Sequence, residues 1–66
     1  MKPYIIIYDT DDDTWNLYEF NTKTNKPQGW PVLTHDESEY ELLEEAKEWG
    51  IPREAVLFKT RSDQLK

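Results

Sequence analysis

The chain has 66 residues, no cysteine and a formal net charge of −6 at pH 7. A single domain of this length has a small core, because it buries only about 60% of the surface that its unfolded chain exposes. The lack of cysteine excludes disulfide bonds, thiolate metal sites and cysteine nucleophiles, and the negative charge disfavours direct binding to nucleic acid or anionic lipid. We therefore expect one domain, residues 1–66, that acts through its surface.

The chain carries no signal for secretion or membrane insertion. Its longest apolar run, Tyr4–Tyr8, is far shorter than the roughly 20 residues that a membrane-spanning helix needs. Residues 1–3 lack the apolar segment and cleavage pattern of a signal peptide. The sequence therefore predicts a soluble, cytoplasmic protein that does not bind membranes.

The first third of the chain predicts two strands joined by an acidic turn. Tyr4–Tyr8 and Trp15–Phe20 are rich in β-branched and aromatic residues, which favour strands. Residues 9–14 between them read Asp-Thr-Asp-Asp-Asp-Thr and are typical of a turn. The simplest arrangement is an antiparallel hairpin with an acidic tip.

Alternate aspartates in this turn have the spacing of a calcium-binding loop. Asp9, Asp11 and Asp13 match the first three ligand positions of such a loop. However, Thr14 stands where the loop needs glycine, and Phe20 stands where a glutamate would complete the ligand set. The sequence therefore predicts neither a metal site nor a cofactor.

The middle of the chain predicts a loop, a short strand and then a helix. Residues 21–28 consist of loop-forming residues, and Trp30–Leu33 reads as an edge strand because its proline cannot donate a backbone hydrogen bond. The helix is expected over Thr34–Trp49, with Thr34 and Glu37 in capping-box spacing. It ends before Gly50.

The elements together predict an α+β fold with the order β-β-(β)-α-β. Ala55–Thr60 supplies the last strand. We expect a small antiparallel sheet of three to four strands with the helix packed on one face. The buried contacts are predicted between helix residues Leu42, Leu43, Ala46 and Trp49 and strand residues Ile5, Ile7, Val56 and Phe58.

The opposite face of this sheet is predicted to be apolar as well. If Ile5 and Ile7 face the helix, alternation turns their neighbours to the other side. Three coverings are open: a protein partner, a sheet-to-sheet homodimer, or the loop over residues 21–29. The candidate apolar interface consists of Tyr4, Ile6, Tyr8 and Trp15.

Acidic residues dominate the predicted solvent-facing side of the helix. We call five of its glutamates the acidic ridge: Glu37, Glu41, Glu44, Glu45 and Glu48. Ordinary solvated helix faces mix charge signs, whereas Lys47 is the one cation among these positions. With the acidic turn as a second negative patch, the predicted partner-binding residues are Glu37, Glu41, Glu44, Glu45, Glu48, Asp11, Asp12 and Asp13.

The spacing of the ridge is close to that of DNA phosphates. Glu37, Glu41, Glu44 and Glu48 span about 16 Å at about 1.5 Å per residue, so these carboxylates lie about 4 to 5 Å apart along the helix axis. One DNA strand carries a charge every 3.4 Å or so. This favours a nucleic-acid mimic that inhibits a basic host protein by occupying its nucleic-acid-binding surface. The alternative is an acidic face that only increases solubility, in a small structural or interaction domain.

Two family resemblances accompany these features. The first depends on the stretch Thr34-His35-Asp36-Glu37, the pair Glu48-Trp49, and a last strand with Lys59 and Arg61. In these parts the chain resembles small acidic phage-encoded inhibitors of host proteins, including DNA mimics. This resemblance implies inhibition by surface occupancy, in the cytoplasm of the host cell.

The second resemblance is to MbtH-like proteins, which are acidic partners of adenylation domains. Pro27-Gln28-Gly29-Trp30 is similar to their Pro-x-Gly-Trp stretch, and Trp49 and Arg53 follow at similar spacing. The family's Ser-x-Trp-Pro stretch is absent near Trp15. This resemblance implies a cleft framed by Trp30 and Trp49.

No residue combination in the sequence predicts a reaction. His35 and Ser38 lie close together in the chain, but a nucleophile and its base also require an orienting acid and an oxyanion hole in a cleft. We therefore predict a non-enzymatic protein-binding domain.

Overall fold

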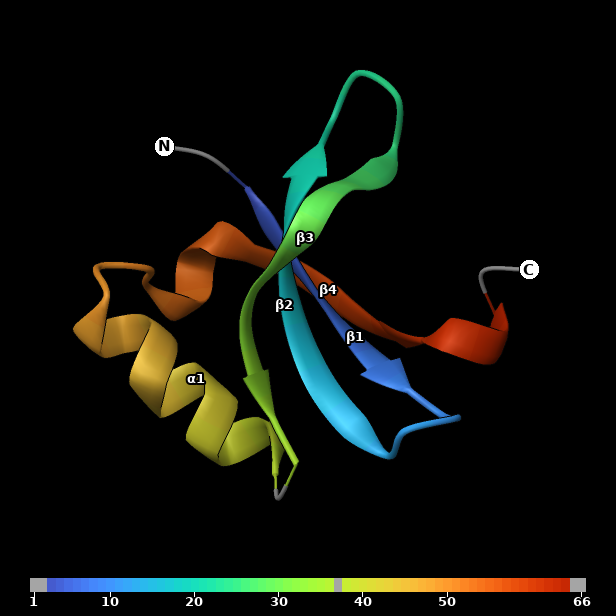
Figure 1. Ribbon diagram of the computed structural model, residues 1–66. Coiled ribbons are helices and arrows are strands. Elements are labelled where there is room, and N and C mark those ends of the chain that lie inside the picture. The colour runs from blue at the N-terminus through green and yellow to red at the C-terminus, as the bar shows by residue number, and fades with distance from the viewer. Residues whose placement is uncertain (1–2, 37, 65–66) are drawn as a thin grey trace.

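The computed structural model describes residues 3–36 and 38–64, and the backbone alone at residue 58. Over these residues the chain forms four strands, one α-helix and two short 3-10 helices (Figure 1). The predicted α+β class is confirmed. In chain order the elements are β1 (Tyr4–Asp9), β2 (Thr14–Asn21), β3 (Lys26–His35), α1 (Glu39–Glu48), η1 (Arg53–Ala55), β4 (Val56–Arg61) and η2 (Ser62–Gln64).

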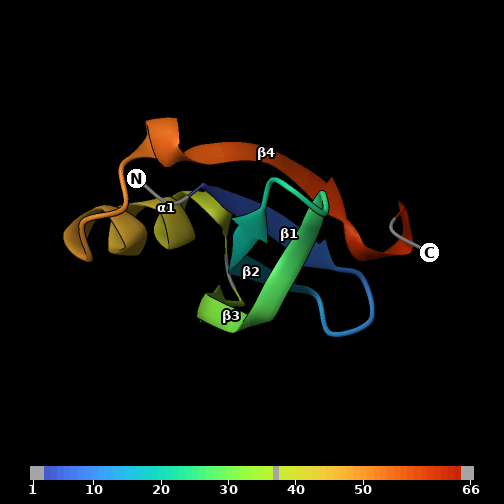
Figure 2. The same ribbon diagram turned by 90° about the horizontal axis from the view of Figure 1, so that it is seen from above.

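The four strands form one mixed sheet in the order β3-β2-β1-β4. β1, β2 and β3 pair antiparallel, as predicted, but β4 lies parallel to β1, so the prediction of a fully antiparallel sheet is wrong. The reason is the single helix between β3 and β4. α1 returns the chain along the length of the sheet, so that β4 starts from the end at which β1 starts. In Figure 2, β3 and β4 lie at opposite edges.

β3 is longer than the predicted strand and contains a large irregularity. It begins at Lys26, so most of the predicted loop is a strand. Leu17 pairs with Leu33 and Glu19 with Gln28, which leaves residues 29–32 opposite a single residue of β2. Gly29 has a φ of 70° at the start of this bulge. The predicted edge position is confirmed, and it explains why β3 tolerates two prolines.

The two hairpin turns have the same construction. Asp9 Oδ1 accepts hydrogen bonds from the amides two and three residues later, at 2.9 and 3.3 Å. Asn21 Oδ1 does the same at 2.9 and 3.2 Å. Each turn ends in a residue with a φ of 58°, Asp13 in the first and Asn25 in the second. Asp and Asn are the non-glycine residues that adopt this left-handed conformation most readily.

The helix is shorter than predicted because its cap is a different residue. Ser38 Oγ accepts a hydrogen bond from the Glu41 amide at 3.1 Å, whereas Thr34 lies in β3 and donates to Asn16 Oδ1 at 2.8 Å. The predicted Thr34 cap is therefore wrong, and Glu37 lies outside the described residues. α1 has ten residues. No helix in residues 3–36 or 38–64 is long and apolar enough to cross a membrane.

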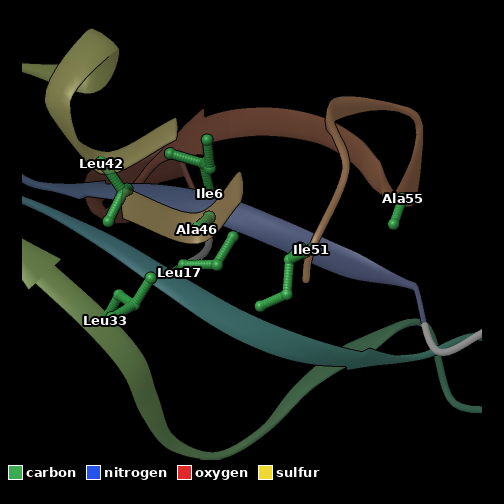
Figure 3. Close-up of a cluster of buried hydrophobic side chains, with 7 residues drawn as sticks. All are labelled: Ile6, Leu17, Leu33, Leu42, Ala46, Ile51 and Ala55. Carbon is green, nitrogen blue, oxygen red and sulfur yellow. The ribbon is translucent and has the colours of Figure 1, made fainter. Parts of the chain in front are cut away.

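The main core lies between α1 and one face of the sheet (Figure 3). Leu42 and Ala46 enter it from the helix and are 0% and 1% exposed. Tyr4, Trp15, Leu43 and Val56 pack around it while remaining partly exposed. The buried members of the cluster are Ile6, Leu17, Leu33, Leu42, Ala46, Ile51 and Ala55.

The predicted orientation of β1 is wrong. Ile6 faces the helix, and Ile5 and Ile7 form a second buried cluster with Phe20. Every residue from Tyr4 to Tyr8 is large and apolar or aromatic, so the alternation of β1 does not reveal which face is which. Trp49 is also misplaced in the prediction, because it is 68% exposed at the end of α1.

The candidate apolar interface is not an open surface. Ile6 is 2% exposed, and Tyr4 and Trp15 pack against the main core. Tyr8 lies against Trp15, with ring centroids 4.7 Å apart. These four residues lie on the helix side of the sheet, so they do not form the face opposite the helix, and a homodimer stays a prediction.

Truncation of Leu42 should be severely destabilising. We expect Leu42→Ala to lower the free energy of unfolding by about 2–5 kcal/mol, because it leaves a cavity beneath the helix. The free energy of unfolding of a domain of this length is about 3–10 kcal/mol, so the substitution removes a large part of it. Urea titration measures the change. Leu57→Ala, the same substitution at a side chain that is 48% exposed, is the control, and an equal loss in both variants would contradict the described core.

The Ser38 cap provides a second test of the fold. Ser38→Ala should destabilise the protein by about 1 kcal/mol, because the Glu41 amide loses its acceptor. Ser38→Asp should retain most of the stability, since a carboxylate also caps a helix and interacts favourably with its dipole. Thermal melts of the two variants measure the difference. Equal melting temperatures would show that Ser38 is not the cap.

Candidate functional site

The outward face of α1 brings most of the acidic ridge together. Four of its five glutamates are described, and they follow one another at spacings of three, one and three residues, which places them on one side of the helix. Leu42 and Ala46 are buried on the opposite side. The fifth, Glu37, lies outside the described residues. The four described members are Glu41, Glu44, Glu45 and Glu48.

His35 is a partner of the ridge that the sequence did not reveal. Its Nε2 lies 3.1 Å from Glu45 Oε1, and its Nδ1 lies 3.8 Å from Glu41 Oε2. His35 ends β3, and the turn into α1 folds it back against the helix. Residue spacing along a predicted helix could not show this contact, because His35 belongs to the strand. The contact holds two ridge carboxylates near one imidazole.

Tyr40 is the second partner of the ridge. Its phenol donates a hydrogen bond to Glu44 Oε1 at 3.2 Å. This hydrogen bond, and to a lesser degree the charge of Glu44, raises the pKa of Tyr40. The aromatic ring is 63% exposed and lies beside the ridge. The hydrogen bond therefore fixes the Glu44 side chain next to a solvent-facing ring.

The ridge is not neutralised by lysine or arginine in the described part of the chain. There, Lys59 pairs with Glu39, with its Nζ 2.9 and 3.1 Å from the two carboxylate oxygens. Arg61 pairs with Asp63 at 3.2 Å. Within residues 3–36 and 38–64, no lysine or arginine lies within ion-pair distance of a ridge glutamate. The four described ridge glutamates therefore have contacts to His35 and Tyr40 but no lysine or arginine counter-charge among these residues.

The acidic turn is a separate cluster. The register of β1, β2 and β3 places it at the same end of the sheet as the start of α1. Asp13 Oδ1 accepts a hydrogen bond from the Tyr8 phenol, and Asp9 holds the turn amides. Asp11 and Asp12 project into solvent. The described residues contain no group of three or more His, Cys, Asp or Glu side chains arranged to hold a metal ion.

A groove runs between α1 and η1. Its volume is about 400 Å³. Leu43, Pro52 and the ring of Tyr40 provide its apolar lining. A smaller groove of about 160 Å³ continues from it toward β4 and shares Glu39, Leu43 and Arg53. The charged side chains that line the larger groove are Glu39, Glu44, Lys47, Arg53 and Glu54.

Trp30 and Trp49 are both exposed, but on different parts of the molecule. Trp30 is 88% exposed on the bulge of β3, and Trp49 is 68% exposed at the end of α1. Figures 1 and 2 both show the first half of β3 well apart from the C-terminal end of α1. Neither indole lines the grooves described above. The two tryptophans therefore do not frame the cleft that an MbtH-like arrangement requires.

Comparison with known proteins provides no further assignment. No protein-family model, curated protein or solved structure matches the chain. The functional argument therefore depends on the geometry and charge of the residues themselves.

The hydrogen bond between Tyr40 and Glu44 can be tested by titration. Glu44→Gln should lower the pKa of Tyr40 toward the ordinary phenol value, because the variant lacks the carboxylate that stabilises the protonated phenol. NMR chemical shifts of the Tyr40 ring, followed against pH, measure the change. Glu48→Gln is the matched control and should leave this titration unchanged. An unaltered Tyr40 titration in Glu44→Gln would show that the hydrogen bond is absent.

Proposed function

We propose that the chain is a non-enzymatic protein-binding domain whose acidic ridge occupies the basic nucleic-acid-binding surface of a host protein. It acts as a nucleic-acid mimic and inhibits its partner by covering that surface. It works in the cytoplasm of the host cell, in the manner of the phage-encoded inhibitors that the sequence resembles. Contact with the partner occurs through charge, so that no cofactor or metal takes part.

The observation that carries this proposal is a row of glutamates on a fixed helix that has no lysine or arginine partner among the described residues. Each pair of like charges three or four residues apart destabilises a helix by about 0.2–0.5 kcal/mol. The described residues supply His35 and Tyr40 as ridge partners, but no lysine or arginine. An adjacent basic surface would relieve this repulsion. The charge is therefore better explained by a basic partner than by the needs of the fold.

The spacing of the carboxylates supports mimicry of a phosphate backbone. Glu41 and Glu48 are separated by about 10 Å along the helix axis, at about 1.5 Å per residue. The four carboxylates lie about 4.5, 1.5 and 4.5 Å apart along the axis, a mean of about 3.5 Å per charge, against about 3.4 Å for one DNA strand. A groove lined by lysine and arginine for a phosphate backbone would therefore meet a similar mean density of negative charge on the ridge.

Anchoring of the helix makes the ridge preorganised. Burial of Leu42 and Ala46 fixes the rotation of α1, and the Ser38 cap fixes its start. The carboxylates therefore lose little backbone freedom when a partner binds, which lowers the entropic cost of association. Long-range attraction to a basic surface would also speed the encounter.

Reversal of the ridge charge should abolish binding without unfolding the domain. The experiment compares capture of partners from host-cell lysate by the wild type and by Glu41→Lys/Glu44→Lys/Glu48→Lys. The captured partner should be lost in the triple variant, because the ridge becomes basic, while the melting temperature stays close to that of the wild type. The matched control is Asp36→Lys/Glu54→Lys/Asp63→Lys, which changes the net charge equally at exposed positions outside the ridge and the acidic turn. Equal loss in both variants would contradict a specific role for the ridge.

Binding should also depend steeply on salt. If each of the four described carboxylates exchanges counterions as a DNA phosphate does, affinity for the captured partner should fall about a hundredfold between about 50 and 200 mM salt. Calorimetric titrations at several salt concentrations measure the slope. A solubilising acidic face would capture nothing selectively, and a partner bound with salt-independent affinity would show that apolar contacts dominate.

A further inference from the structure

The longest acid-free segment of the chain includes two exposed lysines. Residues 20–35 contain no Asp or Glu, although the chain has 14 acidic residues. This segment comprises the end of β2, the turn of the β2–β3 hairpin, and β3 with its bulge. Lys23 and Lys26 are exposed there, and neither has an ion pair within residues 3–36 and 38–64. The hairpin is therefore a basic projection on an acidic protein.

Trp30 stands on this projection in a conformation that holds it in solvent. Its side chain is 88% exposed. Gly29 precedes it with a φ of 70°, a left-handed conformation that glycine adopts readily, and Pro31 follows it with a φ that its ring restricts. Tryptophan is among the residues most enriched at the centres of protein interfaces, where its large ring fills a pocket. An indole presented in this way is suited to insert into another molecule.

The groove between α1 and η1 has the complementary properties. Pockets of about 300–1,000 Å³ accommodate drug-sized ligands, so a groove of about 400 Å³ has room for an indole. Leu43 and Pro52 offer it apolar contacts. Glu44 and Glu54 at the rim have no lysine or arginine partner among the described residues. They could therefore pair with Lys23 and Lys26 of a molecule that brings in Trp30.

The two cations of the groove are compatible with an aromatic occupant. Lys47 and Arg53 line the groove and have no ion pair in the described part of the chain. A lysine or arginine beside the face of an indole is favourable through the cation–π interaction. A basic occupant without an aromatic ring would instead be repelled by them. The lining as a whole therefore matches an indole flanked by lysines.

We infer that the occupant of this groove is Trp30 of a second copy of the chain. The hairpin and the groove are different surfaces, so the contact is head-to-tail and can continue from copy to copy or close into a ring. The contact area is small, so the association is weak and concentration-dependent. The inference does not depend on the function of the acidic ridge, although Glu44 belongs to both sites.

Sedimentation velocity of the pure protein tests this inference without any other partner. The wild type should self-associate at concentrations up to about 1 mM, which populate contacts with a millimolar Kd. Two variants each remove one surface. Trp30→Ala lacks the anchor and keeps the groove, whereas Tyr40→Ala/Glu54→Lys alters the groove and keeps the anchor. All three positions are exposed, so both variants should melt close to the wild type.

Each variant alone should be monomeric, and an equimolar mixture should form a heterodimer that does not grow further. This result is specific to a head-to-tail contact, because the intact groove of one variant receives the intact Trp30 of the other. A monomeric wild type over this concentration range would overturn the inference. Self-association of Trp30→Ala, or a mixture that stays monomeric, would overturn it as well.

Discussion

The burial of one side of α1 against three strands determines the rest of the structure. Leu42 and Ala46 lie against a layer formed by Ile6, Leu17 and Leu33. This contact fixes how α1 is rotated about its axis, and a rotation of one residue position would bring either Glu41 and Glu45 or Lys47 into the core. The cost of burying an unpaired carboxylate is much larger than the repulsion among solvated glutamates. The core therefore keeps the ridge in solvent.

The sequence predicted the parts of the fold that depend on local pattern. Residue periodicity and turn chemistry predicted the first hairpin, the edge position of β3, the inward-facing Leu42 and Ala46, and the outward-facing glutamates. The start of α1 was predicted wrongly at Thr34, although Ser38 and Glu41 also have capping-box spacing. The Thr34–Glu37 pair has the same spacing, and local pattern alone does not decide between two such pairs.

Features that depend on contacts distant in the chain were not visible in the sequence. The uniform apolar content of β1 hides which of its faces meets the helix, and the parallel pairing of β4 depends on the path of α1 across the sheet. The contact of His35 with the ridge requires β3 to run past its predicted end. The bulge that exposes Trp30 follows from the register between β2 and β3. Each of these is a property of the packed sheet.

The two hairpin turns share the same backbone construction but carry different charges. In each turn an Asp or Asn side chain accepts two amide hydrogen bonds at the start, and an Asp or Asn adopts the left-handed conformation at the end. Between them lie the exposed residues Asp11 and Asp12 in the first turn and residues 22–24 in the second, whereas Thr10 is hydrogen-bonded to Ser62. One turn carries aspartates there and the other carries a lysine and threonines. The middle positions of either tip can consequently be rewritten, by evolution or by design, to alter the electric dipole of the molecule while its backbone stays the same.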